Sequence, residues 1–164
     1  MKFDEEHFTR QEQALGFLET ARVHLLERDG GAWLDWEGGG TIHVAILDPT
    51  PEDLRLLTAD VANLPWSVAI VAVNHSREQL VGLVEELSNA DLPSTEPDSW
   101  VSLGWSPIHN AVVATLRRVD QAAIDWLKEH VPADALRVEI RPSAGRAYAP
   151  NATNRTGVAE IIER

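Results

Sequence analysis

The chain of 164 residues contains no cysteine, only two lysines and no apolar run as long as 18 residues. Without cysteine, a disulfide framework and a thiolate metal or redox site are excluded. Without a long apolar run, we expect no membrane-spanning helix and no membrane partner. The first residues also lack a basic leader followed by an apolar stretch, so we expect a cytoplasmic protein.

Basic residues are also few relative to acidic ones, and the formal net charge is −12. Residues 1–100 hold 6 Lys and Arg against 19 Asp and Glu, whereas residues 101–164 hold 8 against 7. The largest basic cluster is the pair Arg117-Arg118, and neutralising phosphates requires more than that, so no nucleic-acid partner is expected. The acidic excess of residues 1–100 predicts a solvated surface. The alternative is an acidic patch that steers a basic partner toward the protein.

Local patterns predict helices separated by β-rich runs. The first helix is expected to begin at Thr9, which has capping-box spacing to Glu12, and to end at Gly30-Gly31. Thr50 as a cap and Pro51 at the first helical position begin a second helix. Their predicted buried stripes are Leu15, Leu18, Ala21 and Leu25 in the first helix, and Leu54, Leu57 and Val61 in the second.

The β-rich runs indicate strands. Residues 32–36 and 41–47 flank the glycine-rich segment 37–40 and predict a hairpin, in which His43 points outward and its neighbours inward. Residues 66–73 are almost all apolar, which is typical of a central strand covered on both faces. A third helix is expected from Ser76, which has capping-box spacing to Gln79.

The pattern then recurs. Trp33 and Trp100 are about 67 residues apart, and Val68 and Val138 are about 70 residues apart. The second occurrence of the pattern predicts a hairpin near 105–109, a helix at 120–130 and a strand at 136–141. The predicted fold is therefore α+β, with an N-terminal helix, two similar ββαβ units joined by a helix and a linker, and a C-terminal tail. The expected boundaries are 1–30 for the N-terminal helix, 31–90 for the first lobe with the connecting helix, 91–99 for the linker, 100–142 for the second lobe and 143–164 for the tail.

Reactive constellations are hard to find. The six histidines are scattered, no His-Glu-x-x-His or Gly-x-Ser-x-Gly motif occurs, and the glycines at 38–40 precede a strand rather than the helix that a phosphate cradle needs. We therefore predict no catalytic, cofactor-binding or metal site and no enzyme. The alternative of a small enzyme would use the hairpin-end carboxylates Asp35, Glu37 and Asp48.

Surface features favour binding. Trp105 is expected in a hairpin loop beside Pro107, where an exposed aromatic residue often anchors an interface. The strand at 136–141 is expected at a sheet edge, with Arg137, Glu139 and Arg141 on one face and backbone groups open to a partner strand.

Four short segments resemble the pro-region of bacterial secreted serine proteases of the α-lytic protease and streptogrisin type. They are residues 31–35, 44–49, 74–80 and 110–116, within a likeness that spans about 30–142. The resemblance implies an α/β chaperone that templates the folding of its protease, inhibits it and places its C-terminal tail in the active-site cleft. The segment after Pro142 is in the equivalent place, which adds Arg146 and Tyr148 to the expected partner-binding residues.

The resulting expectation is a non-enzymatic protein-binding domain that assists the folding of, or inhibits, a protease-like partner. An acidic immunity or antitoxin-like protein that neutralises a basic partner is the alternative, motivated by the charge of the first hundred residues. In both cases the expected partner is a protein, and no cofactor is needed.

Overall fold

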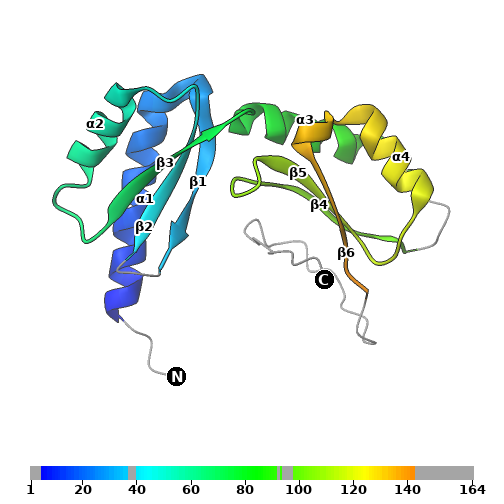
Figure 1. The fold of residues 1–164 in the computed structure, drawn as a ribbon. Coiled ribbons are helices and arrows are strands. Elements are labelled where there is room, and N and C mark those ends of the chain that lie inside the picture. Colours follow the sequence, from blue (N-terminus) through cyan, green and yellow to red (C-terminus); the bar gives the residue numbers. More distant parts are fainter. Residues whose placement is uncertain (1–4, 37–39, 92, 94–97, 143–164) are drawn as a thin grey trace. The chain divides into compact units, whose positions relative to one another are not determined.

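The computed structural model describes residues 5–36, 40–91, 93 and 98–142. The chain is α+β, with an N-terminal helix and two three-stranded sheets covered by helices, as the sequence predicts (Figure 1). In chain order the elements are α1 (Glu5–Leu25), η1 (Leu26–Arg28), β1 (Asp29–Asp35), β2 (Thr41–Leu47), α2 (Pro51–Asp60), β3 (Ser67–Val73), α3 (Arg77–Asn89), β4 (Trp100–Ser106), β5 (Ala111–Leu116), α4 (Gln121–His130), η3 (Ala133–Ala135) and β6 (Leu136–Ile140).

The contacts between residues divide the chain into two compact units. Of the described residues, the first unit holds those up to Leu80 together with Pro107–Asn110, and the second holds those of Val81–Ser106 and from Ala111 to 142. Most of α3 therefore belongs with the second sheet, whereas the sequence grouped this helix with the first lobe. The predicted tail, 143–164, is outside the described residues.

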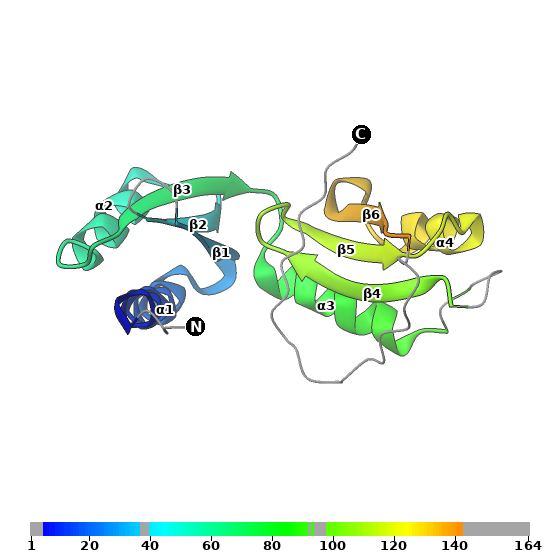
Figure 2. The same cartoon turned by 90° about the horizontal axis from the view of Figure 1, so that it is seen from below.

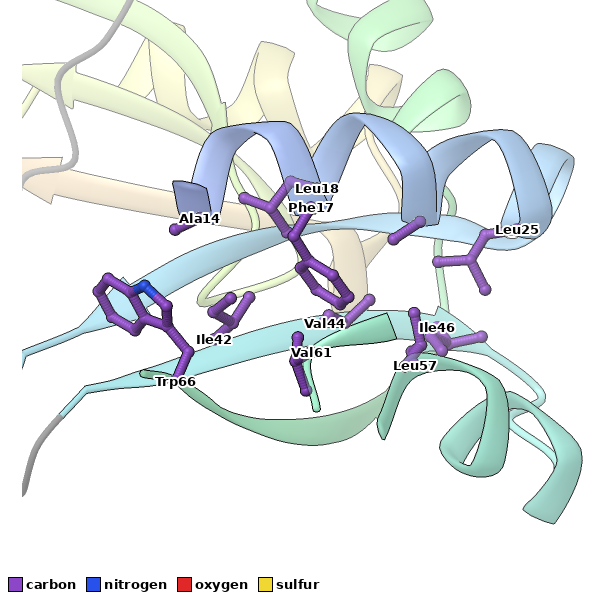
Figure 3. Close-up of a cluster of buried hydrophobic side chains, with 11 residues drawn as sticks. Ala14, Phe17, Leu18, Leu25, Ile42, Val44, Ile46, Leu57, Val61 and Trp66 are labelled. Atoms are coloured by element: carbon purple, nitrogen blue, oxygen red, sulfur yellow. The ribbon is translucent and has the colours of Figure 1, made fainter. Parts of the chain in front are cut away.

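In the first unit, β1 and β2 form an antiparallel hairpin, and α2 connects β2 to the parallel strand β3. Alternate residues of β2 face the helices, and Ile42, Val44 and Ile46 are at most 1% exposed. Phe17 and Leu18 of α1 lie over these side chains (Figure 3). His43 lies on the outer face of the sheet, as predicted, where its ring stacks on that of Trp33 at 4.9 Å.

Helix α1 differs from its prediction at both ends. It already includes Thr9, which is therefore not a cap, and it ends at Leu25, before Gly30 and Gly31 enter β1. The buried stripe consists of Ala14, Phe17, Leu18, Ala21 and Leu25, whereas the predicted Leu15 is 50% exposed. The stripe is displaced because α1 presents the other flank of its apolar pattern to the sheet.

Helix α2 begins as predicted. Thr50 accepts a hydrogen bond from the Asp53 backbone, Asp53 accepts one from the Thr50 backbone in return, and Pro51 opens the helix. Of the predicted stripe, Leu57 and Val61 are buried but Leu54 is 48% exposed. The capping box at Ser76 and Gln79 of α3 is also confirmed.

The second unit repeats the first in topology and register. β4 pairs antiparallel with β5, and β5 pairs parallel with β6 through α4, whose cap is Asp120. Both hairpins have an irregularity at the same place, between Asp29 and Gly31 in one and between Trp100 and Ser102 in the other. The matching position of this irregularity is a further likeness between the two units.

The register corrects two details of the predicted repeat. Trp100 pairs with Leu116 as Asp29 pairs with Ile46, so Trp100 corresponds to Asp29, an offset of 71, and not to Trp33. Strand β3 is at the edge of its sheet, where the sequence suggested the centre. It is apolar on both sides because Val68 and Ile70 pack on the core, whereas Ala69, Val71 and Val73 line the outer face of the sheet.

Candidate partner-binding surface

The outer edge of β6 is open in the part of the chain that the structure describes, since the strand order of the second sheet ends there. The Arg141 backbone N–H donates to Leu116 at 2.7 Å, so the backbone groups of Arg137, Glu139 and Arg141 turn toward β5. Because these groups alternate along a parallel strand, those of Leu136, Val138 and Ile140 turn outward. The edge can therefore receive a further strand.

The charged residues of β6 lie on the outer face of this sheet. Their neighbours across the sheet are Val113 and Thr115 of β5, whereas the fully buried Val112 and Leu116 face the other way, toward the helices. Helices α3 and α4 lie on one side of the sheet in Figure 1, and Figure 2 views the sheet from the opposite side.

Glu139 is the most unusual residue of this face. It is 2% exposed, and neither carboxylate oxygen accepts a hydrogen bond from the described residues. Two arginines of the same strand compensate its charge, with Arg141 Nη2 at 3.2 Å from Oε2 and Arg137 Nε at 3.9 Å from Oε1. A buried carboxylate with open acceptor positions gains free energy when a donor reaches it. Its two neighbouring cations, which are 34% and 45% exposed, also suit an approaching carboxylate.

The structure does not bring all the predicted binding residues together. Trp105 is in strand β4 opposite Val112, half-buried and on the helix side of the sheet, and is not in the hairpin loop. It is thus on the opposite face and the opposite edge from Glu139. The loop prediction was wrong because the turn residues begin only at Pro107. Arg146 and Tyr148 lie outside the described residues.

Two residues that the sequence reading missed share the outer face with Glu139. Thr115 of β5 pairs with Glu139 in register, and Ser102 of β4 pairs with Thr115, so three polar residues form a row across the sheet. Thr115 is 6% exposed, and Ser102 is exposed. In a strand, residues 111, 113 and 115 point to one face and residues 112, 114 and 116 to the other. Because β5 is almost wholly apolar, its sequence has no alternation of polar and apolar residues that could have identified the outer face.

Two other buried carboxylates, Asp53 and Asp120, accept hydrogen bonds within their own units. Arg28 donates to Asp53 through two nitrogens, at 2.7 and 2.8 Å, and both Thr50 N–H and Thr50 Oγ1 donate to the same carboxylate at 2.8 Å. These bonds, led by those of Arg28, hold the pKa of Asp53 well below its usual range. In the second unit, Asp120 accepts from the Ala123 backbone and from Ser99 Oγ.

The carboxylates of the enzyme alternative do not converge. Asp35 lies opposite Thr41 at the beginning of β2, and Asp48 follows the last residue of that strand. The length of the strand separates them by on the order of 20 Å, too far to act on one bond. Glu37 is outside the described residues. No group of three or more His, Asp or Glu within the described ranges is placed to hold a metal ion.

The chain matches no model of a protein family and no curated protein. Of the helices that the structure describes, none is long and apolar enough to cross a membrane.

Proposed function

We propose that this chain is a non-enzymatic protein-binding domain of the protease pro-region type, which assists the folding of or inhibits a protease-like partner by adding a partner strand to β6. The observation that carries the proposal is the open edge of β6 next to the buried carboxylate of Glu139. Backbone groups at the edge supply affinity, and the neighbouring charges select the partner strand.

The partner strand would extend the sheet and place alternate side chains on its outer face. A donor on the partner, such as a backbone amide, hydroxyl or cationic side chain, would reach the acceptor positions of Glu139. Arg137 and Arg141 alternate with apolar residues along the strand, a pattern that also protects a free edge from indiscriminate pairing.

The test is inhibition of a purified serine protease of the α-lytic protease or streptogrisin type. The unmodified chain is expected to inhibit with micromolar or tighter affinity. Ile140 is 40% exposed, and its N–H turns outward, so Ile140→Pro removes one edge donor without breaking a bond within the sheet. This variant is expected to inhibit at least about tenfold more weakly.

The matched control is Ile140→Thr, which keeps the N–H and the β-branched shape at the same position. It is expected to inhibit like the unmodified chain. Equal weakening by both variants would contradict binding through the backbone edge, and no inhibition by the unmodified chain would contradict the pro-region proposal.

The acidic surface supports a second candidate, an immunity or antitoxin-like protein that neutralises a basic partner. Exposed acids occupy all three helices that precede the second sheet: Glu12, Glu19, Glu52, Asp60, Glu78, Glu85 and Glu86. An association rate with a basic protein that falls steeply between low and physiological salt would favour this candidate over strand addition.

A further inference from the structure

The four sheet edges differ in how they are protected from pairing with another chain. β1 and β4 each contain an irregularity, and β6 carries alternating charges. Bulges and charges of this kind are the usual protection of an edge strand. β3 has neither, because its sequence Ser-Val-Ala-Ile-Val-Ala-Val is uncharged and all seven residues pair with β2 without a shift.

The open backbone groups of β3 are symmetric about its middle residue. Ser67 N–H donates to Gly40 at 3.2 Å, so the backbone groups of Ser67 and of every second residue after it turn toward β2. Those of Val68, Ile70 and Ala72 therefore turn outward. Among the described residues no strand lies beyond this edge.

We propose that two copies of this chain pair through their β3 strands, antiparallel and about a twofold axis at Ile70, so that the two sheets of the first units become one six-stranded sheet. In this register Ile70 exchanges both backbone hydrogen bonds with Ile70 of the second copy, and Val68 does the same with Ala72. An interface of this kind uses the same surface on both copies, as a twofold axis requires. It would form about six new backbone hydrogen bonds.

Two further features favour a second copy as the occupant. Each chain has a net charge of −12, so a contact between two copies is least unfavourable where it adds no close pairs of like charges, and β3 is such a surface. Helix α2, which contacts β3, also carries two leucines that the first unit leaves 48% and 37% exposed, Leu54 and Leu56. The two residues are on different flanks of α2, and extending the sheet brings a second copy of this helix to the same side, where it provides apolar surface to the flank that faces it.

The first measurement is the mass of the full chain in solution by sedimentation equilibrium, from about 1 to 200 µM. The expected mass at the upper end is twice the chain mass of 18.1 kDa. Ala72 is exposed and would lie beside Val68 of the second copy, so Ala72→Lys is expected to return the mass to that of one chain. The matched control, Ala133→Lys at an exposed residue of η3, is expected to leave the dimer intact.

Cross-linking provides a second measurement that does not depend on the lysine variant folding. The proposed register places Ala69 directly opposite Val71 of the second copy, with about 5 Å between their Cβ atoms, and leaves like residues about 7–8 Å apart on the diagonal. Because the chain has no cysteine, Ala69→Cys and Val71→Cys add the only thiols. Mixed under mild oxidation, the two variants are expected to form a disulfide-linked dimer several-fold faster than either variant alone.

Several results would overturn the proposal. They are a mass of one chain at 200 µM, a dimer that a folded Ala72→Lys variant retains, and cross-linking that is as fast with either single cysteine variant as with the mixture. If β3 pairs with a strand of another protein instead, the purified chain would keep the mass of one chain, which is the first of these results.

Discussion

Single residues link the beginning of each sheet to the helix that crosses it. Arg28 precedes β1 and binds Asp53 in the first turn of α2, and Ser99 precedes β4 and binds Asp120, the cap of α4. Arg28 and Ser99 are 71 residues apart, like the strands that follow them. The two units thus retain the same link between a strand and a helix N-terminus but build it from an ion pair in one and from a hydroxyl in the other.

The ion pair predicts a pH-dependent contribution to stability. The pKa of Asp53 is lowered in the folded chain, so its contribution is fully present above the ordinary carboxyl pKa of about 4 and is lost as the pH falls below it. We expect Asp53→Asn to lower the free energy of unfolding at pH 7 by about 1–3 kcal/mol, because a partly buried, hydrogen-bonded charge pair is broken. The difference from the unmodified chain is expected to shrink toward pH 2, as measured by urea unfolding across pH.

The neighbouring acid Glu52 provides a control, since its bonds to Arg55 are solvent-exposed. Glu52→Gln is expected to change stability little at any pH. An Asp53→Asn deficit that stayed constant from pH 7 to pH 2 would show that the ion pair is not its cause.

The backbone conformation of Leu26 leads to a second prediction for a single residue. It follows the last residue of α1 and has φ 51°, a left-handed conformation that costs free energy for a residue with a Cβ atom. Its side chain is 73% exposed and gains little from burial. Leu26→Gly is expected to raise the free energy of unfolding by about 1 kcal/mol. The same substitution at Leu15, exposed in the middle of α1, is expected to lower it by about 0.5–1 kcal/mol. A loss at both positions in thermal unfolding would contradict the strained helix end.

Among the elements, the crossover helices show the repeat most plainly. Leu57 of α2 and Leu127 of α4 are 70 residues apart and at most 2% exposed, and each packs its helix on its own sheet. Leu57→Ala and Leu127→Ala are each expected to destabilise the chain by about 2–5 kcal/mol, because both leave a cavity in a small core. Leu56→Ala, at a residue that is 37% exposed, is expected to cost less than about 1 kcal/mol in chemical denaturation. If only one of the two buried substitutions were costly, the units would not be equivalent in packing.

Element types could be predicted from the sequence wherever a local rule decides them. Thr50 with Pro51 and Ser76 with Gln79 signal helix starts through bonds within one turn, and both predictions were confirmed. The exposure of Leu15 in α1 and of Leu54 in α2 depends on which flank of a helix meets the sheet, which no local rule contains. The edge position of β3 was hidden because its outer face is apolar.

For the whole molecule, the sequence predicted the topology better than the binding surface. The alternation of residues 136–141 located the three charged residues on one face, and the register agrees. The burial of Glu139 and the position of Trp105 on the opposite face depend on how the three strands pair. They could not be predicted from the sequence of one strand. Net charge is a property of composition, so the acidic surface was predictable, although its partner is not.

Hydrogen exchange at β6 tests the central claim most directly. In the free chain, the amides of Val138 and Ile140 are expected to exchange much faster than that of Arg141, which donates to Leu116. When a protease of the pro-region's partner type is bound, these two amides are expected to become protected as the added strand accepts their hydrogen bonds. A complex that forms while both amides continue to exchange at the free rate would contradict binding through this edge.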